Sequence, residues 1–375
     1  MIHIHAGLPK TGSSAIQRFL AQNREALAGR GLLVPEAGLG ARGDHHEWMY
    51  ALGGISAGDR RDAVEDLVAY LQDHEAEQIL ISTEFAFLMM RFGFAGKGYR
   101  ALRRHGFALK FHLFLRPQTD FAVSAHPEFL RNLLVDQPFQ RFVETNFMPF
   151  ARDYGDIVRR LQKVSDAPVS VLPYNRAARD EGVWWPLLAS AGLDVPAAER
   201  VGFSPPGEVN PSLGPIGVMA LTNALRRTDR REMMKRWGLR RAVRKAVLDI
   251  TAKFPAEQRR YNPISPGRRD KLWEESRALN DPLAREVWGR DWDEVFATEK
   301  ALRPPREVYQ RRSDEAGSDT AVLHDRLAQR VFRAIRQKSA EVAAKRERVW
   351  SLKRVLGSPV DRLADRAMRR IVRGR

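Results

Sequence analysis

The segment Gly7-Leu-Pro-Lys-Thr-Gly-Ser-Ser14 gathers several residue types that bind anions. Its two glycines permit close approach of the backbone to a ligand, and its lysine adds a positive charge. Three of its side chains carry hydroxyl groups, namely Thr11, Ser13 and Ser14. A helix pattern follows, so free N–H groups and the positive end of a helix dipole would face the same anion. The alternative is an ordinary glycine turn with a serine cap, but the density of these features favours an anion site.

The order of residues in this segment differs from that of a nucleoside triphosphatase loop. A Walker A loop reads GxxxxGK[ST], so its lysine follows the second glycine and its Ser or Thr hydroxyl binds magnesium. Here Lys10 precedes Gly12 by two positions. The pattern of that NTPase loop therefore does not match.

Short apolar runs alternate with helix patterns through the first two hundred residues. Apolar runs of strand length cover 2–5, 78–82, 108–115 and 168–174. Helical spacing of apolar residues covers 13–31, 59–73 and 150–163. Strands separated by helices predict a parallel sheet wrapped by helices, the α/β class. From about residue 205 onward the chain is expected to be mainly helical.

The carboxyl ends of the expected strands identify the segments in which to look for a site. In open α/β sheets, ligands bind beyond these ends. Three segments directly follow a strand: Lys10–Ser14, Ser82–Phe85 and Arg116–Ser124.

Two of these segments resemble a known family. Pro9-Lys-Thr-Gly-Ser-Ser14 is similar to the 5′-phosphosulfate loop, commonly PK[ST]G[TS][TS], of sulfotransferases that use 3′-phosphoadenosine-5′-phosphosulfate. The same family has an arginine at a strand end and a serine eight residues later, and both bind the 3′-phosphate. Arg116 and Ser124 fit that signature. The resemblance covers roughly residues 1–300 and is closest to bacterial sulfotransferase-like proteins.

The resemblance implies a P-loop-like fold and a role for each matching residue. Lys10 would stabilise the leaving phosphate, while Thr11, Gly12, Ser13 and Ser14 would hold the 5′-phosphate. No metal would be required, because a sulfuryl group carries less negative charge than a phosphoryl group. The acceptor would be a hydroxyl group, on the family's pattern that of a carbohydrate or glycolipid.

A base is needed to take the proton of the acceptor hydroxyl, and members of the family use a histidine or a glutamate. Glu84 follows the strand 78–82, where it would serve either as that base or as a cap of the next helix. His45 and His46 are the competing candidates, because histidine titrates near neutral pH. Adjacent histidines on a loop are also common surface residues, and the sequence does not decide between the two.

Other conspicuous residues receive structural interpretations. His126 is expected to be structural, and Trp184 and Trp185 are expected to pack in the core or in a lid rather than stack on a sugar. Asn210 and Ser212 resemble a recurring element of the same bacterial group, with no role assigned.

Composition limits the remaining possibilities. The 375 residues contain no cysteine, which excludes disulfides and thiolate chemistry. The start of the chain lacks the pattern of a secretory signal and no apolar run is of transmembrane length, so a cytoplasmic location is expected. The formal net charge of +17 predicts an anionic partner.

Much of that charge lies near the end of the chain. Residues 321–375 hold 16 Lys and Arg against 5 Asp and Glu, and a second basic run covers 226–245. We expect a catalytic domain over 1–300, then a linker and a basic amphipathic helical tail over 301–375. That tail either contacts an anionic membrane at the inner surface or is a solvated extension.

Two other functions compete with sulfuryl transfer. A P-loop kinase or NTPase would share the fold but needs magnesium and a Walker lysine. A non-catalytic protein that binds a membrane or a polyanion through its tail is the second alternative. Nucleic acid is a disfavoured partner, because the tail lacks interleaved aromatic residues and any known nucleic-acid motif.

Overall fold

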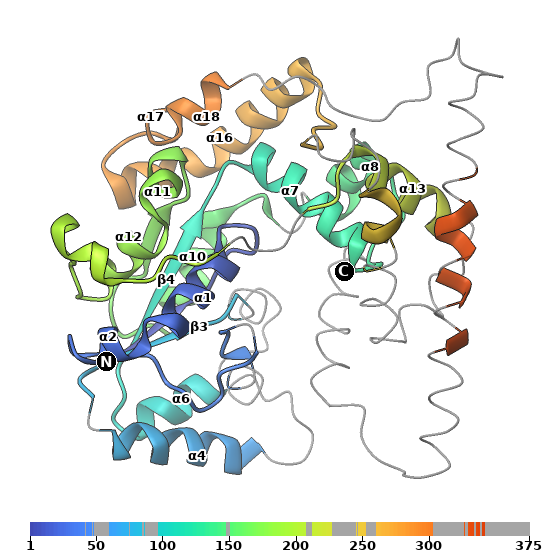
Figure 1. The fold of residues 1–375 in the computed structure, drawn as a ribbon. Coiled ribbons are helices and arrows are strands. Elements are labelled where there is room, and N and C mark those ends of the chain that lie inside the picture. Colours follow the sequence, from blue (N-terminus) through green and yellow to red (C-terminus); the bar gives the residue numbers. More distant parts are fainter. Residues whose placement is uncertain are drawn as a thin grey trace. The chain divides into compact units, whose positions relative to one another are not determined.

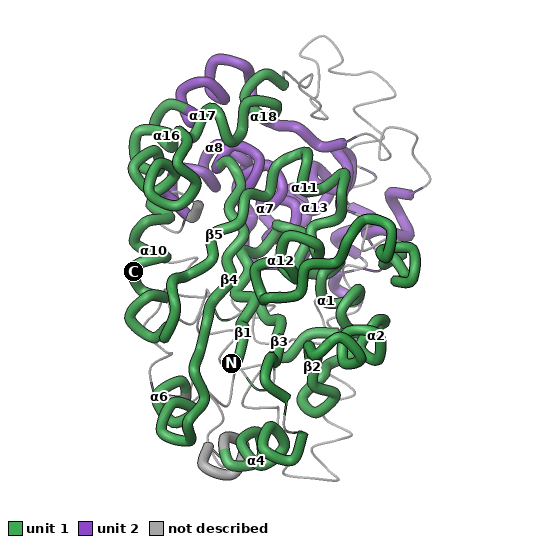
Figure 2. The backbone as a smooth tube through the Cα atoms, turned by 90° about the vertical axis from the view of Figure 1, so that its left-hand side faces the viewer, with its two compact units in different colours: residues 1–117, 153–210, 274–302 green, residues 118–152, 211–273, 303–375 purple. Residues whose placement is uncertain are grey.

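The computed structural model describes residues 1–41, 43–46, 48, 60–74, 76–84, 86, 97–147, 151–207, 212–226, 245, 247–252, 260–302, 326, 329–333, 335–337, 340 and 341. The chain forms two compact units, coloured separately in Figure 2. The first unit comprises residues 1–117, 153–210 and 274–302, and the second comprises 118–152, 211–273 and 303–375.

The first unit, part of which Figure 1 shows around the labelled strands β3 and β4, contains a five-stranded parallel sheet with strand order β2-β3-β1-β4-β5 (Figure 2). The strands are β1 (Ile2–His5), β2 (Leu32–Leu33), β3 (Gln78–Ser82), β4 (Leu109–Leu115) and β5 (Ser170–Pro173). The α/β class and the parallel sheet are thus confirmed, although the two-residue β2 was not predicted. Strand β1 is central, and the chain first adds strands on its β3 side and then on its β4 side. The loop after β1 therefore lies where the direction of strand addition reverses, a position that favours ligand binding.

Helices cover both faces of this sheet. Its helices are α1 (Ser13–Gln22), α2 (Arg24–Ala28), α4 (Arg60–Asp73), α6 (Lys97–Arg104), α10 (Tyr154–Gln162), α11 (Arg176–Glu181), α12 (Trp184–Ser190), α17 (Trp292–Val295) and α18 (Ala297–Ala301), with a 3-10 turn at Ala197–Gly202. On one face, Leu80 and Phe114 join a buried cluster with residues of α1 and α12. On the opposite face, the ring of Phe111 lies edge-on to Tyr99 of α6, with centroids 5.3 Å apart. Each fully buried Leu or Phe side chain contributes about 1.5–3 kcal/mol.

The two tryptophans of α12 belong to this core. Trp184 stacks on Phe19 with centroids 4.8 Å apart, and Trp185 meets the same ring edge-on at 5.2 Å. Their expected packing role is confirmed.

The helix expected over 13–31 is divided at Asn23. The Asn23 side chain donates to the Ser204 carbonyl oxygen at 2.9 Å and accepts from the Ser204 N–H group at 2.8 Å. This two-way pairing holds Asn23 outside helical geometry, with φ −111° and ψ 18°. Helix α1 consequently ends at Gln22 and α2 begins at Arg24.

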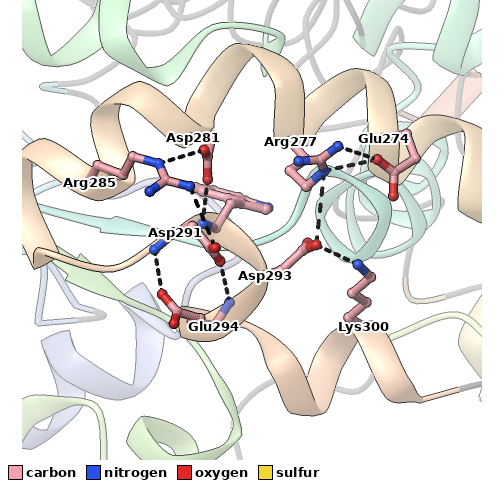
Figure 3. Close-up of polar contacts among 9 residues, drawn as sticks. Glu274, Arg277, Asp281, Arg285, Asp291, Asp293, Glu294 and Lys300 are labelled. Atoms are coloured by element: carbon pink, nitrogen blue, oxygen red, sulfur yellow. Dashed lines mark hydrogen bonds and ion pairs between the residues drawn. The ribbon is translucent and has the colours of Figure 1, made fainter.

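A network of charged residues joins α16 (Pro266–Trp288) to α17 and α18 (Figure 3). Asp281 accepts the N–H group of Trp292 at 2.8 Å and pairs with Arg285 at 2.9 Å. The Trp292 N–H group, followed by Arg285, lowers the pKa of Asp281. Asp293 pairs with Lys300. These contacts hold the segment that leads into α18 against the part of α16 that belongs to the first unit.

The second unit is helical in the part that the structure describes. It contains α7 (Gln118–Arg131), α8 (Phe139–Phe142), the π-helix Val143–Phe147 and α13 (Pro215–Arg226), and α7 packs against α8 and α13. His126 of α7 is buried, and its ring nitrogens lie 3.1 Å from the Tyr261 hydroxyl and 2.9 Å from the Gln137 carbonyl oxygen. Its expected structural role is confirmed.

Most of the two basic segments lies outside the described residues. This applies to nearly all of the run 226–245, to most of the tail and to Asn210, whereas Ser212 is described and exposed. Within the described part of the tail, Val331 and Ile335 are buried. These two apolar side chains of the amphipathic tail are therefore covered by the chain itself. Among the described residues, no helix combines the length and the apolar character needed to cross a membrane.

Candidate functional site

The loop after β1 turns sharply after continuing the sheet for three residues. The N–H groups of Ala6 and Leu8 donate to the carbonyl oxygens of His112 and Phe114 in β4. The chain then turns through positive φ angles at Lys10 (67°) and Gly12 (78°) before α1 begins at Ser13. A left-handed conformation at a non-glycine residue costs about 1–2 kcal/mol. The conformation of Lys10 must therefore be supported by its surroundings.

The two glycines of the loop lie against other strand ends. A Cβ atom on Gly7 would stand 3.4 Å from Cα and Cβ of Glu84, and one on Gly12 would stand 3.0 Å from Val183 and 3.2 Å from the Tyr174 ring. Both also have positive φ angles, 100° and 78°. Glycine is thus favoured at both positions for conformation, and at Gly12 for space as well.

The hydroxyl groups of Thr11 and Ser13 have a different role from the one that the sequence predicts. Both side chains are buried, and both donate to the Leu8 carbonyl oxygen, at 2.6 Å and 3.1 Å. The loop curls back on itself, and these hydroxyls satisfy a carbonyl group that the sheet leaves unpaired. They stabilise the loop in this structure instead of pointing their protons at a ligand.

The main chain supplies the remaining donors of the loop. Among the described residues, the N–H groups of Thr11, Gly12, Ser13 and Ser14 donate to no protein acceptor, and the Ser14 hydroxyl has no hydrogen-bond partner. The first N–H groups of a helix lack intrahelical acceptors and carry its positive dipole end. Together with the half-buried Lys10, these donors are the groups with which helix N-termini bind anions.

Arg116 supports the loop from β4. It is 4% exposed, and its Nη1 donates to the Lys10 carbonyl oxygen at 2.6 Å. Its own carbonyl oxygen accepts the hydroxyl of the buried Tyr154 at 3.0 Å. The bond to Lys10 stabilises the left-handed backbone there, a role that sequence reasoning did not assign. Ser124 lies on α7 in the second unit and is half-buried.

Glu84 and His46 lie at the end of β3 beside the loop. The chain after β3 stays paired with β1, because the Thr83 N–H group donates to the His5 carbonyl oxygen at 2.9 Å. Glu84 is half-buried against Gly7. The Nδ1 atom of His46 lies 2.9 Å from the Thr83 hydroxyl. Two groups able to take a proton are thus placed at the same sheet edge as the loop after β1.

His45 is built into the fold. It is fully buried, its Nε2 lies 3.0 Å from the Pro35 carbonyl oxygen, and its Nδ1 accepts the Ser82 N–H group at 3.3 Å. Burial, opposed by the Pro35 hydrogen bond, lowers the pKa of His45. A proton on Nε2 and a lone pair on Nδ1 satisfy both neighbours. This geometry supports a structural role and leaves Glu84 and His46 as the candidate bases.

Sequence reasoning missed Tyr174 and Arg179. The Tyr174 ring lies against Gly12, and the guanidinium carbons of Arg116 and Arg179 lie 5.2 and 5.5 Å from its centroid. The available signal was that Tyr174 directly follows β5, whose carboxyl end lies beside that of β4. The rule that ligands bind at strand ends applies to this position as well.

No family model, curated protein or solved structure matches the chain. A function must therefore be inferred from the loop and from the residues around it. These can bind an anion through main-chain donors and a lysine, and they offer a carboxylate and an imidazole for proton transfer.

Proposed function

We propose that this protein is a sulfotransferase that uses 3′-phosphoadenosine-5′-phosphosulfate as sulfuryl donor and a hydroxyl group as acceptor. The observation that carries the proposal is the loop Lys10–Ser14 at the reversal point of a parallel sheet, in which, among the described residues, the N–H groups of Thr11 to Ser14 and the Ser14 hydroxyl have no protein partner. The early position of Lys10 and the Arg116–Ser124 spacing, both similar to sulfotransferases, extend that observation to a phosphosulfate. On this proposal the fold is the P-loop-like fold of that family.

Each loop residue has a definite part in the transfer. The donor supplies a sulfuryl group bound to a good leaving group, adenosine 3′,5′-bisphosphate. The N–H groups of Thr11 to Ser14 hold the 5′-phosphate, and the Lys10 ammonium stabilises charge on the oxygen that links phosphorus to sulfur. The acceptor oxygen forms a bond to sulfur as the bond to that bridging oxygen breaks, with the three atoms in line.

The acceptor proton requires a base near the loop. Glu84 is the base that we propose, because its backbone and Cβ lie against Gly7. His46 is the alternative at the same sheet edge. The products are a sulfate ester, adenosine 3′,5′-bisphosphate and a protonated base. We propose a carbohydrate or glycolipid as the class of acceptor, in keeping with the resemblance.

Ligand preference tests the proposal. Calorimetry should be done with adenosine 3′,5′-bisphosphate, with adenosine 5′-monophosphate, and with ATP plus magnesium. We expect the bisphosphate to bind most tightly. In the Ser124→Ala variant its advantage over the monophosphate should fall by about tenfold or more, since hydrogen bonds to charged groups contribute about 1.5–3 kcal/mol.

Arg116→Ala should weaken both adenosine ligands, because Arg116 also holds the Lys10 carbonyl group. Arg104→Ala, which removes an exposed arginine of α6, is the matched control and should bind as the wild type does. A preference for ATP with magnesium would instead identify a phosphotransferase and overturn the proposal.

A further inference from the structure

We propose that Arg179 and Glu299 are positioning residues for the loop Lys10–Ser14 and act on it through the ring of Tyr174. The inference rests on the proposed function in treating this loop as the donor-binding segment. All the residues involved belong to the first unit.

Tyr174 is the point of contact with the loop. Its ring would stand 3.2 Å from a Cβ atom on Gly12, so it limits the space at the residue that directly precedes α1. The same ring lies 5.2 Å from the guanidinium carbon of Arg116, which donates to the Lys10 carbonyl oxygen. Tyr174 thus contacts the loop directly at Gly12 and indirectly at Lys10, the two positions of the turn with positive φ angles.

Arg179 is held beside this ring by a buried carboxylate. Its guanidinium carbon lies 5.5 Å from the Tyr174 centroid, and its Nη2 donates to Glu299 Oε1 at 3.1 Å. The Glu299 side chain is 1% exposed, whereas that of Arg179 is 29% exposed. A buried carboxylate is costly unless it is paired. Glu299 therefore restrains an arginine that would otherwise extend into solvent, and the restrained cation is attracted to the ring face.

The backbone on both sides of Tyr174 is fixed as well. The Tyr174 N–H group donates to the Leu115 carbonyl oxygen at 2.7 Å. The Asn175 side chain accepts from the Ala178 N–H group at 3.0 Å and donates to the Val295 carbonyl oxygen at 3.2 Å. These bonds tie α11 to α17, next to α18, which carries Glu299. With the backbone fixed and one side of Tyr174 packed against the buried cluster, the Arg179–Glu299 pair acts on the orientation of the ring.

The variants must remove the pair without leaving a charge buried. Arg179→Met alone would remove the Arg179 ion pair from the buried Glu299 carboxylate and destabilise the fold. The double variant Arg179→Met/Glu299→Gln avoids this. Arg176→Met is the matched control, because Arg176 lies on the same helix in an exposed pair with Asp180. Arg179→Lys keeps the charge next to Glu299 but loses the planar group. It should therefore disturb the loop less than the double variant does, and more than Arg176→Met.

Hydrogen exchange in the ligand-free protein measures directly how well the loop is ordered. The N–H groups of Ala15 and Ile16 donate to the Gly12 carbonyl oxygen, at 2.8 and 3.0 Å, and so report the order of the junction between loop and helix. We expect the double variant to speed their exchange by about three- to thirtyfold, as the loss of a cation–ring contact predicts. Exchange in β4 should stay at the wild-type rate, whereas a merely structural role would speed it too.

Binding of adenosine 3′,5′-bisphosphate supplies the second readout, and the double variant should lose affinity by a similar factor. Unchanged exchange at Ala15 and Ile16 would overturn the inference, as would equal acceleration in β4 or in Arg176→Met. If the wild type binds no bisphosphate, the proposed function fails, while the exchange experiment still decides whether Arg179 and Glu299 position the loop.

Discussion

Among single residues, Glu84 and His46 compete for the role of general base. Both lie at the end of β3, Glu84 against Gly7 and His46 with Nδ1 2.9 Å from the Thr83 hydroxyl. Removal of a general base costs about 10²–10⁴ in rate. We expect Glu84→Gln to lower turnover by this factor while the affinity for adenosine 3′,5′-bisphosphate stays near that of the wild type. Release of the bisphosphate from the donor, with methyl glycosides as acceptors, measures the rate.

The pH dependence separates these two residues more sharply than the rate alone. A base must be deprotonated, so the rate rises with pH through its pKa, and removing that base flattens the rise. Glu84→Gln should flatten it and His46→Gln should not. Glu77→Gln, at the opposite and exposed end of β3, is the control. A flat profile in His46→Gln with a normal one in Glu84→Gln would assign the base to His46.

At the scale of elements, the start of α1 depends on the space that its glycine leaves. Gly12 and Gly31 have similar φ angles, 78° and 83°, but only Gly12 has neighbours within 4 Å of a Cβ position. Alanine at either site costs about 1–2 kcal/mol for the left-handed backbone. Gly12→Ala must also displace Val183 and Tyr174, so it should destabilise more and abolish binding of the bisphosphate.

Urea unfolding and calorimetry of the two glycine variants test this expectation. Gly31→Ala should lose stability only and should bind the bisphosphate as the wild type does. Equal losses of stability in both variants, with binding intact, would show that Tyr174 and Val183 do not constrain the loop.

The elements that could be predicted from the sequence are those that depend on residues near one another in the chain. Strands β1, β3, β4 and β5 follow from short apolar runs, and the loop follows from its own residue types. The division of the first helix at Asn23 depends on Ser204, 181 residues away in sequence, so no local pattern could indicate it. A strand of two residues, Leu32–Leu33, is likewise too short to leave a pattern.

Prediction of the site from sequence was limited in the same way, because some of its contacts join residues far apart in the chain. The order of Lys10 and Gly12 and the position of Arg116 identified the loop, because each follows a strand. The choice between His45 and His46 depends on which ring turns inward toward Ser82, which adjacent identical residues cannot reveal. The role of Glu299 depends on contact with Arg179, 120 residues earlier in the chain. Contacts of this kind become visible only once the chain has folded.

At the scale of the whole molecule, buried histidines couple folding to pH. Among the residues that the structure describes, burial lowers the pKa of five of them: His3, His5, His45, His112 and His126. The pKa of His5 falls to about 3 and that of His126 to about 4. Above pH 6.5 these rings are neutral in both the folded and the unfolded states. Below it the unfolded state binds protons that the folded state cannot, so stability falls with pH.

Three of these histidines line one face of the central sheet. His3 Nδ1 lies 2.9 Å from His112 Nε2, and His5 Nδ1 lies 2.8 Å from the Ser82 hydroxyl. Each such histidine adds at most about 1.4 kcal/mol per pH unit to the fall in the free energy of unfolding. His5→Asn keeps an acceptor near Ser82 but cannot titrate. Its urea midpoint should therefore fall less between pH 7 and 4.5 than that of the wild type, while exposed His74→Asn should match the wild type.

Because these histidines are unevenly distributed, the stability of the two units should depend differently on acidic pH. His3, His5, His45 and His112 belong to the first unit, and His126 belongs to the second. More protons are therefore taken up when the first unit unfolds, and its stability should decline more steeply below pH 6.5. Hydrogen exchange at pH 7, 5.5 and 4.5 measures this by comparing β4 amides with α7 amides. We expect protection in β4 to fall faster, because four of the depressed pKa values act there; parallel losses in β4 and α7 would contradict this coupling.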